Sequence, residues 1–380
     1  MSWYMSDLVN IRSSYVLAFR LSAHDIHRRP ERIYIASLHW NDEKILRDYW
    51  SDSVLALAKA IGRDNVYVSI YESGSWDKTK DVLRDLDKSL GDIGVKRNIT
   101  FSNITHAEEI SQMPKSGWVY TVDGKKEMRR IPYLSRIRNL SLEPLETLAM
   151  QGQHFDKVLF LNDVIFSTND VLRLLDTNGG DYAAACSMDF SKAPYFYDTF
   201  ALRDSEGHEA VMQTWPYFRS RDSRHAIKQH RPIPVTSCWN GIVAMSAQPF
   251  ISNPPLRFRG IDDSLAAFHV EGSECCLIHF DNPLSHQKGI YVNPDVRVGY
   301  NREAYNAVHP KGRFLSSTNI FISLWKNRLL RHTKWPSFKE GVVYRKIKEW
   351  RKQNPTLKEV GGICIVNEMQ VLRANGWAHV

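Results

Sequence analysis

The chain of 380 residues lacks any apolar run that approaches the roughly 18 residues of a membrane-spanning helix. Its N-terminal stretch, from Trp3 to Leu21, is interrupted by polar side chains such as Asp7, Asn10 and Arg12, and so it does not form the apolar core of a signal peptide. We therefore expect that the chain as given neither spans a membrane nor carries a signal peptide. Any membrane anchor is expected at the N-terminal side, outside this chain.

Cysteine is also scarce, with five cysteines in 380 residues. None of them forms a CxxC pair, and no histidine lies at the spacing typical of zinc ligands, which argues against a metal-thiolate site. Cys186 and Cys238 fall in two segments predicted for the core of a sheet. From the sequence, they either form one disulfide or remain buried free thiols.

The excess of positive charge is small. The 50 Lys and Arg residues against 42 Asp and Glu give a net charge of +8 and a pI near 9.1, which indicates a mixed surface rather than a nucleic-acid binder. The basic and aromatic segment 326–352 is interpreted as a solvated helical face. A composition of 43% hydrophobic and 24% charged residues indicates a soluble globular chain, long enough for one large α/β domain or two smaller ones.

Strand and helix patterns alternate in the first third of the chain. β-branched and aromatic residues predict strands over 33–37, 65–72 and 96–102, and amphipathic spacing predicts helices over 43–61 and 76–90. Such alternation is typical of a parallel sheet with helices on both faces, in which ligands bind beyond the carboxyl ends of the strands.

The remaining segments are less regular. Residues 112–127 are predicted to form a polar loop, and 132–150 a helix despite Pro144. Two further strands are predicted over 181–190 and 235–245, the second bending at Gly241.

The stretch FDKVLFLNDVIF, residues 155–166, carries the clearest functional signal. An apolar strand ends abruptly in Asn162 and Asp163, which places a carboxylate at the edge of a sheet. A metal ion that bridges a diphosphate fits such a position. The competing interpretation is that Asp163 caps the turn before Thr168 and Asn169.

Three long phrases resemble the fungal capsule-associated α-1,3-mannosyltransferases, glycosyltransferase family 69. These phrases are LNDVIF, AAACSMDFSKAPYFYDTFALRDSEGHEAVMQTWPYFRS and VTSCWNGIVAM, and the resemblance covers roughly residues 31–309. It implies an α/β chain with a GT-A glycosyltransferase fold, Rossmann-like, with a mostly parallel central sheet and helices on both faces. We expect a stem at residues 1–28, a catalytic domain at 29–315, and a C-terminal extension at 316–380 that packs on it.

The resemblance also implies a metal site. Asn162-Asp163-Val164 stands where the family's fold has an aspartate motif, so Asp163 is expected to bind Mn²⁺ or another divalent cation as the single carboxylate ligand. His309 follows the strand predicted near residues 295–300 and is expected as the second metal ligand. His279 is the competing candidate, although it precedes that strand.

Donor contacts are expected from several segments. A glycine at Gly241 lets the backbone approach a ligand closely, and Trp239 offers a sugar ring a flat apolar face. Arg138 resembles the arginine that mannosyltransferases of this fold direct at the donor. The competing interpretation is an exposed helix residue that pairs with Glu143 or Glu146. The full set of expected donor-binding residues is Ser37, Glu72, Arg138, Asn139, Asn162, Trp239, Asn240 and Gly241.

The resemblance implies a retaining α-1,3-mannosyltransferase that moves mannose from GDP-mannose to the 3-hydroxyl of an α-mannoside in fungal glycan biosynthesis. Glu274, Asp189, Asp204 and Glu209 are the expected catalytic carboxylates, and the sequence does not choose among them. The implied location is the Golgi lumen, as the soluble part of a type II membrane protein. The alternative is a mannoside-binding protein with a decayed glycosyltransferase fold.

Overall fold

The computed structural model describes residues 31–112, 114–121, 123–210, 212–311, 314–333 and 336–380. The stem predicted at residues 1–28 lies outside this part. Among the described residues, none of the helices has the length and apolar character required to cross a bilayer.

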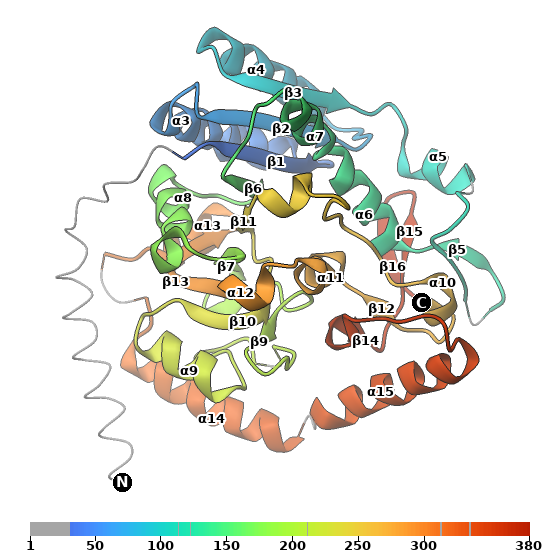
Figure 1. Ribbon diagram of the computed structural model, residues 1–380. Coiled ribbons are helices and arrows are strands. Elements are labelled where there is room, and N and C mark those ends of the chain that lie inside the picture. The colour runs from blue at the N-terminus through green and yellow to red at the C-terminus, as the bar shows by residue number, and fades with distance from the viewer. Residues whose placement is uncertain (1–30, 113, 122, 211, 312–313, 334–335) are drawn as a thin grey trace.

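A mixed sheet of ten strands forms the centre of the molecule (Figure 1). Nine of its strands follow one path, and β8 (Tyr195–Phe196) pairs with β7 beside it. In spatial order the nine are β3 (Lys96–Phe101), β2 (Val66–Glu72), β1 (Ile33–His39), β6 (Lys157–Leu161), β11 (Ile242–Ser246), β7 (Ala184–Lys192), β13 (Ile290–Gly299), β10 (Ile233–Ser237) and β9 (Arg203–Asp204).

The sheet combines two parallel blocks. Strands β3, β2, β1 and β6 run parallel, as do β7 and β13, and β11 lies between the blocks antiparallel to both. Antiparallel β10 and β9 complete the far side. The predicted fold class, an α/β chain of GT-A type with a mostly parallel central sheet, is therefore confirmed.

Strand β1 shows why the sheet is covered on both faces. Ile33 and Ile35 belong to one buried cluster and Tyr34 and Ala36 to the other, because successive side chains of a strand point to opposite faces. Both sets are almost fully buried. A strand buried on both sides has the nearly continuous apolar sequence seen here.

Helices supply the two covering layers (Figure 1). The first cluster includes residues of α3, α4 and α8, and the second includes residues of α7, α9 and α11. The helices are α2 (Glu43–Ile45), the π-turn η1 (Leu46–Trp50), α3 (Ser51–Ile61), α4 (Thr79–Asp92), α5 (His106–Ser111), α6 (Arg130–Leu140), α7 (Glu143–Met150), α8 (Thr168–Leu175), η2 (Thr177–Gly180), α9 (Arg221–Lys228), η3 (Gln248–Ile251), α10 (Asp263–Ala266), α11 (Glu274–Asp281), α12 (Ser285–Lys288), α13 (Arg302–Val308), α14 (Ser317–Thr333), α15 (Pro336–Gln353) and η4 (Gly362–Cys364).

Three local predictions are corrected. The helix predicted over 132–150 is divided into α6 and α7, because Pro144 occupies the first turn of a new helix, where its missing N–H costs nothing. The strand predicted over 235–245 is two strands, since Asn240 and Gly241 both have positive φ, at 37° and 85°, and redirect the chain. The predicted polar loop 112–127 contains a small hairpin of β4 (Trp118–Tyr120) and β5 (Lys126–Met128).

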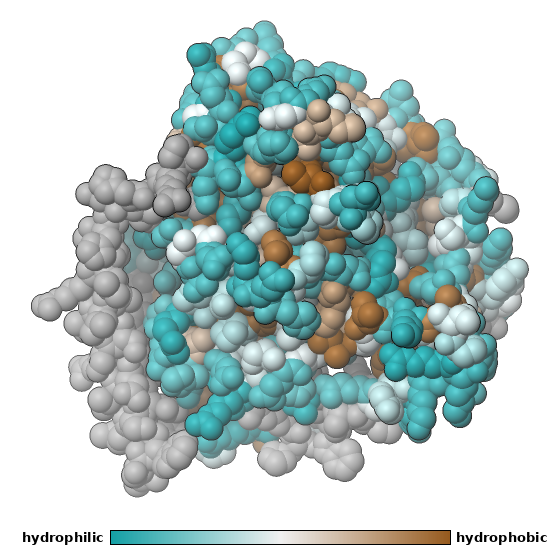
Figure 2. All heavy atoms as spheres, in the orientation of Figure 1, coloured by the Kyte–Doolittle hydropathy of each residue, from teal (hydrophilic) through white to brown (hydrophobic). Residues whose placement is uncertain are grey.

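The C-terminal residues pack along the flank of the central sheet. Strand β14 (Ile365–Val366) pairs with β12 (Glu271–Gly272), and a disulfide joins Cys276 to Cys364. The hairpin of β15 (Gln370–Arg373) and β16 (Gly376–His379) stands beside α6 (Figure 1). On the face drawn in Figure 2, apolar side chains form separate small patches in a mostly hydrophilic surface.

Candidate active site

Strand directions bring four chain segments to one edge of the sheet. Because β11 is antiparallel to β6, its first residues lie beside the end of β6, and the Asn162 amide donates to the Gly241 carbonyl at 3.0 Å. Because β7 and β13 are parallel, Asp189 lies opposite Val298 near their shared carboxyl ends. Residues of four separate segments therefore meet where the sequence predicted a ligand site.

The bend from Trp239 to Gly241 organises this edge. The Asn240 side chain donates to Asp189 Oδ1 at 3.2 Å and to the Asp198 carbonyl at 2.7 Å. A disulfide joins Cys186 on β7 to Cys238, immediately before the bend, and resolves the pairing that the sequence left open. Trp239 Nε1 donates to Asn162 Oδ1 at 3.2 Å, so the bend and the end of β6 are also linked by their side chains.

A cleft of about 580 Å³ opens beside this bend. The cleft is lined by one face of α6, the loop after β8, the start of α11 and the C-terminal hairpin. The polar and aromatic lining residues are Arg130, Arg138, Asn162, Tyr197, Asp198, Thr199, Phe200, Arg203, Glu209, Trp239, Ser273, Glu274, Tyr300, Asn367, Glu368, Gln370 and Trp377.

Arg138 lies where opposite charges and aromatic rings meet. Its Nε donates to Glu274 Oε1 at 3.1 Å, and its guanidinium carbon lies 4.8 Å from the centre of the Trp239 ring. The Glu274 side chain is 3% exposed and that of Arg138 16%. The planar guanidinium has further N–H donors beyond the one given to Glu274, and these suit the paired oxygens of a phosphate.

Two carboxylates, the buried Asp189 and the half-buried Asp198, lie next to this pair. Burial raises the pKa of Asp189, and the negative charge of Asp198 raises it further, while hydrogen bonds from Asn240 and Tyr300 lower it. Burial likewise raises the pKa of Asp198, and nearby Glu274 adds to that increase. Carboxylates collected in a desolvated cleft are costly, so the site favours a ligand with developing positive charge.

Asp163 follows β6 at the same edge. Burial raises the pKa of its carboxyl, the negative charge of Asp42 raises it further, and Arg138 lowers it. A hard divalent cation would relieve this repulsion between carboxylates. In the part of the chain that the structure describes, no three His, Cys, Asp or Glu side chains gather closely enough to hold a metal ion. Asp163 therefore fits a cation that takes most of its ligands from a bound diphosphate and water.

The two candidate histidines have other partners. His309 lies 3.6 Å from Asp170 through Nε2, and its Nδ1 lies 2.9 Å from the Tyr305 carbonyl. His279 is fully buried, and its Nε2 lies 2.7 Å from the Cys238 carbonyl. The structure thus does not bring either imidazole to Asp163.

Three residues that were expected to contact the donor instead form hydrogen bonds within the fold. Ser37 donates to the Leu161 carbonyl at 2.7 Å, and both atoms of the Asn139 amide bond the backbone of Phe258. Glu72 is buried and accepts from the Ser75 amide at 2.5 Å. None of the three lines the cleft.

Of the other two expected catalytic carboxylates, one belongs to the scaffold and one to the cleft. Asp204 is buried and accepts four backbone N–H groups, from Glu206, His208, Arg219 and Ser220, so it organises a turn. Glu209 lines the cleft.

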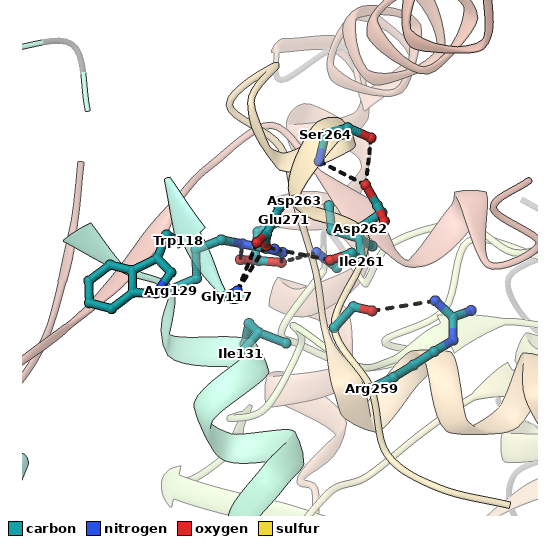
Figure 3. A network of polar contacts seen from close by, with 12 residues as sticks. Gly117, Trp118, Arg129, Ile131, Arg259, Ile261, Asp262, Asp263, Ser264 and Glu271 are labelled. Carbon is teal, nitrogen blue, oxygen red and sulfur yellow. Dashed lines mark hydrogen bonds and ion pairs between the residues drawn. The ribbon is translucent and has the colours of Figure 1, made fainter. Parts of the chain in front are cut away.

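The segment Glu271-Gly272-Ser273-Glu274 carries two carboxylates, one in the scaffold and one in the cleft. Glu271 accepts from the buried Arg129 at 2.6 Å and 3.0 Å, and Arg129 also donates to Asp263 at 2.7 Å (Figure 3). This network joins the start of α6 to β12 and α10. Glu274 is left to meet Arg138 in the cleft.

Arg130, Asp198, Arg203 and Tyr300 are among the cleft residues that sequence reasoning missed. Asp198 and Arg203 lie inside the longest phrase that carries the family resemblance, so that phrase held the signal. Tyr300 directly follows β13 and donates to Asp189 Oδ2 at 3.1 Å. Its position after a strand at the ligand edge was a second signal.

Comparison with known proteins identifies the family. Residues 32–281 match the family described as Cryptococcal mannosyltransferase 1, which is more than half of the chain. The chain belongs to this family. The family resemblance predicted from the three phrases is therefore confirmed, and the chain is a member of a glycosyltransferase family.

A similar curated protein is the α-1,3-mannosyltransferase CMT1 of Cryptococcus neoformans var. neoformans serotype D. The two chains are 24% identical over 276 residues, which is 66% of this chain and 54% of that protein. The chain thus spans about half the length of this relative.

Two solved structures are weakly similar to the chain. The mannosyltransferase PcManGT from Pyrobaculum calidifontis, in complex with GDP-Man and Mn²⁺, has a TM-score of 0.38 at 11% identity, over 82% of this chain and 68% of that one. GalNAc-T7 with UDP, GalNAc and Mn²⁺ has a TM-score of 0.42 at 12% identity, over 86% and 55%. At these scores neither likeness bears on the ligands of this chain.

Proposed function

We propose that this chain is a retaining mannosyltransferase, which moves mannose from GDP-mannose to the 3-hydroxyl of an α-mannoside in fungal glycan biosynthesis. Membership of the mannosyltransferase family supports the transfer of mannose. The observation that carries the proposal is the placement of Arg138 in the cleft, between Glu274 and the Trp239 ring. An arginine fixed in this way is suited to the diphosphate of a sugar nucleotide.

In the proposed reaction the acceptor hydroxyl attacks on the face from which the diphosphate departs. The bond from the anomeric carbon to the diphosphate oxygen breaks, and its electron pair leaves with GDP. The acceptor oxygen bonds to the anomeric carbon, and its proton moves to the departing phosphate oxygen. Arg138 stabilises negative charge on the leaving group, while Asp189 and Asp198 stabilise positive charge on the sugar ring.

The proposal includes a divalent cation, manganese, at Asp163. When bound, this cation neutralises charge on the diphosphate. The chain's own contribution is a carboxylate fixed at the end of β6, next to Asn162, whose side-chain oxygen is held by Trp239.

We also propose that the chain acts in the Golgi lumen, as part of a type II membrane protein. The disulfides Cys186–Cys238 and Cys276–Cys364 support an oxidising compartment. Asn98 and Asn103 head Asn-x-Thr sequons and are exposed, as glycan acceptors must be. Mass spectrometry of the protein purified from a eukaryotic secretory host tests this, and free thiols at all five cysteines with both asparagines unmodified would contradict it.

The activity itself is tested with purified protein, GDP-mannose, Mn²⁺ and p-nitrophenyl α-mannoside. We expect a product one hexose heavier than the acceptor, with an α-1,3 linkage by NMR, and no product from UDP-glucose. Free mannose as the sole product would indicate hydrolysis instead. Binding of the mannoside without release of GDP under any metal would favour a decayed fold that only binds sugars.

A further inference from the structure

The cleft extends beyond the part of the chain that matches the family. The match ends at residue 281, yet Asn367, Glu368, Gln370 and Trp377 line the same cleft as Arg138. The C-terminal residues therefore contribute a wall of their own to the site.

This wall is held rigidly against the rest of the molecule. The Cys276–Cys364 disulfide attaches it to α11, and Arg130 Nη1 donates to Gln370 Oε1 at 2.6 Å. Arg373 makes two hydrogen bonds to Glu127, at 2.7 Å and 2.9 Å. A wall fixed before the ligand arrives loses little entropy on binding.

Trp377 offers an aromatic surface at the end of this cleft. The Arg130 guanidinium lies 4.5 Å from the Trp377 ring centre, and the His379 ring meets its edge at 4.8 Å. Even so, 44% of Trp377 is exposed. An indole with one supported face and accessible area is suited to stack on the apolar face of a sugar ring.

Arg203 supplies a second, independent indication of a ligand. Its side chain lines the cleft and is fully buried, with Nε bonded to the Ile363 carbonyl at 2.6 Å. Its Nη2 has no hydrogen-bond partner among the described residues. A buried donor without a partner is costly, so a ligand oxygen at this position would be favourable.

The chemistry of this wall favours a neutral polyhydroxyl ligand. Its Asn367, Gln370 and Glu368 side chains match hydroxyl groups, as does Glu209 elsewhere in the cleft, and the carboxylates oppose a diphosphate. The nucleoside of the donor is expected at the carboxyl ends of β1 and β2, whose last residues, His39 and Glu72, do not line this cleft.

We propose that Trp377 and Arg203 form a subsite for the acceptor glycan, in which Trp377 stacks on a sugar of the acceptor chain and Arg203 donates to one of its oxygens. This inference rests on the proposed mannosyl transfer, since it names the acceptor as a mannose chain. Through Trp377 it assigns part of acceptor recognition to the C-terminal hairpin, outside the region that matches the family.

Calorimetric titration of methyl α-mannoside and a linear mannotriose into the full chain tests the subsite without requiring turnover. We expect Trp377→Ala to weaken mannotriose binding about tenfold, Trp377→Phe to restore most of it, and GDP binding with Mn²⁺ to stay unchanged. Trp325→Ala is the matched control, because Trp325 is 47% exposed on α14 and does not line the cleft. Thermal unfolding of each variant verifies the fold.

Failure of the subsite differs from failure of the proposed function. Unchanged mannotriose affinity in Trp377→Ala, a loss confined to GDP binding, or no detectable mannotriose binding by the wild-type chain would overturn the subsite. A wild-type chain that binds mannotriose in a Trp377-dependent manner but transfers no mannose would instead contradict the proposed activity.

Discussion

The guanidinium of Arg138 is held by contacts of two kinds, an ion pair with Glu274 and the face of the Trp239 ring. Both depend on its planar shape. A lysine at the same position keeps the charge but neither donates in parallel nor stacks in the same way. The geometry of this side chain, beyond its charge, is therefore expected to matter for transfer.

We predict that Arg138→Lys lowers kcat for mannosyl transfer roughly ten- to a hundredfold, because the lysine stabilises the leaving diphosphate less well. Steady-state assays with GDP-mannose measure this. Arg136→Lys is the matched control on the same helix, where Arg136 pairs with Glu109 outside the cleft, and it is expected to retain wild-type kcat. Equal kcat for the two variants would refute the role of Arg138.

The buried side chain of His279 makes the stability of the fold depend on pH. Burial lowers the pKa of His279 to about 4 in the folded chain, while its Nε2–H donates to the Cys238 carbonyl and its Nδ1 has no hydrogen-bond partner in the part of the chain that the structure describes. The unfolded chain, with a pKa near 6.5, binds the proton more readily, so stability present above pH 6.5 is lost as pH falls toward 4.

We expect the free energy of unfolding of the wild-type chain to fall by about 2 kcal/mol from pH 7 to pH 5 because of His279. His279→Gln, which keeps an N–H donor, should show a correspondingly flatter dependence in urea unfolding at the two pH values. Exposed His225→Gln is the control and should follow the wild-type slope. An unchanged slope in His279→Gln would contradict this explanation.

At the scale of elements, the bend before β11 determines whether the site exists. Gly241 has φ of 85°, and a Cβ added there would lie 2.7 Å from Val298 Cγ2 and 3.3 Å from Val164 Cγ1. Only glycine therefore satisfies both the backbone conformation and the close packing at this edge.

We predict that Gly241→Ala lowers the free energy of unfolding by roughly 2–4 kcal/mol through strain and steric overlap, and reduces transfer. Gly179→Ala separates the two causes, because Gly179 also has positive φ, at 68°, but has open space around it, so only about 1 kcal/mol is expected. Denaturant unfolding of both variants provides the comparison. Equal losses of unfolding free energy in the two variants would exclude the close contacts with Val298 and Val164 as a cause.

The sequence predicts individual strands and helices better than it predicts which strands pair with one another. Local periodicity is sufficient for the first half of the sheet, where β1, β2 and β3 alternate with helices. It is insufficient for β10 and β11, because their separation depends on two residues with positive φ and on pairing with distant strands. The local sequence pattern alone does not predict such pairings between distant strands.

The same limit applies to the candidate site. Residues next to strand ends, such as Asp189 and Trp239, could be placed near the ligand edge from the sequence. Ser37 and Asn139 also lie near expected ligand positions, but hydrogen bonds with Leu161 and Phe258 direct their side chains into the scaffold. Those bonds join segments more than a hundred positions apart, so they depend on the tertiary fold.

At the scale of the whole molecule, the C-terminal extension closes one side of the cleft, and one covalent bond attaches it to the catalytic sheet's covering helix. Cys276 and Cys364 are separated by 88 positions. A cross-link over so long a segment restricts the unfolded chain considerably.

We predict that Cys276→Ala combined with Cys364→Ala lowers the free energy of unfolding by about 2–4 kcal/mol and makes the C-terminal hairpin easier to release by limited proteolysis. Cys275→Ala, which removes the neighbouring buried free thiol, is the control and should cost less than about 1 kcal/mol. Thermal unfolding and protease mapping are the measurements. A double variant as stable as the control would show that noncovalent contacts alone hold the extension.

The most direct test of the central claim is the rate of mannosyl transfer by Asp163→Ala, measured with GDP-mannose and Mn²⁺ beside the wild-type chain. Asp64→Ala serves as the control, because the Asp64 side chain is 89% exposed and precedes β2, at the end of the strand opposite to the ligand edge. We predict that Asp163→Ala folds normally but transfers mannose at least about 100-fold more slowly, and that chelation with EDTA stops the wild-type reaction. A folded Asp163→Ala variant that transfers mannose at the wild-type rate would contradict the account.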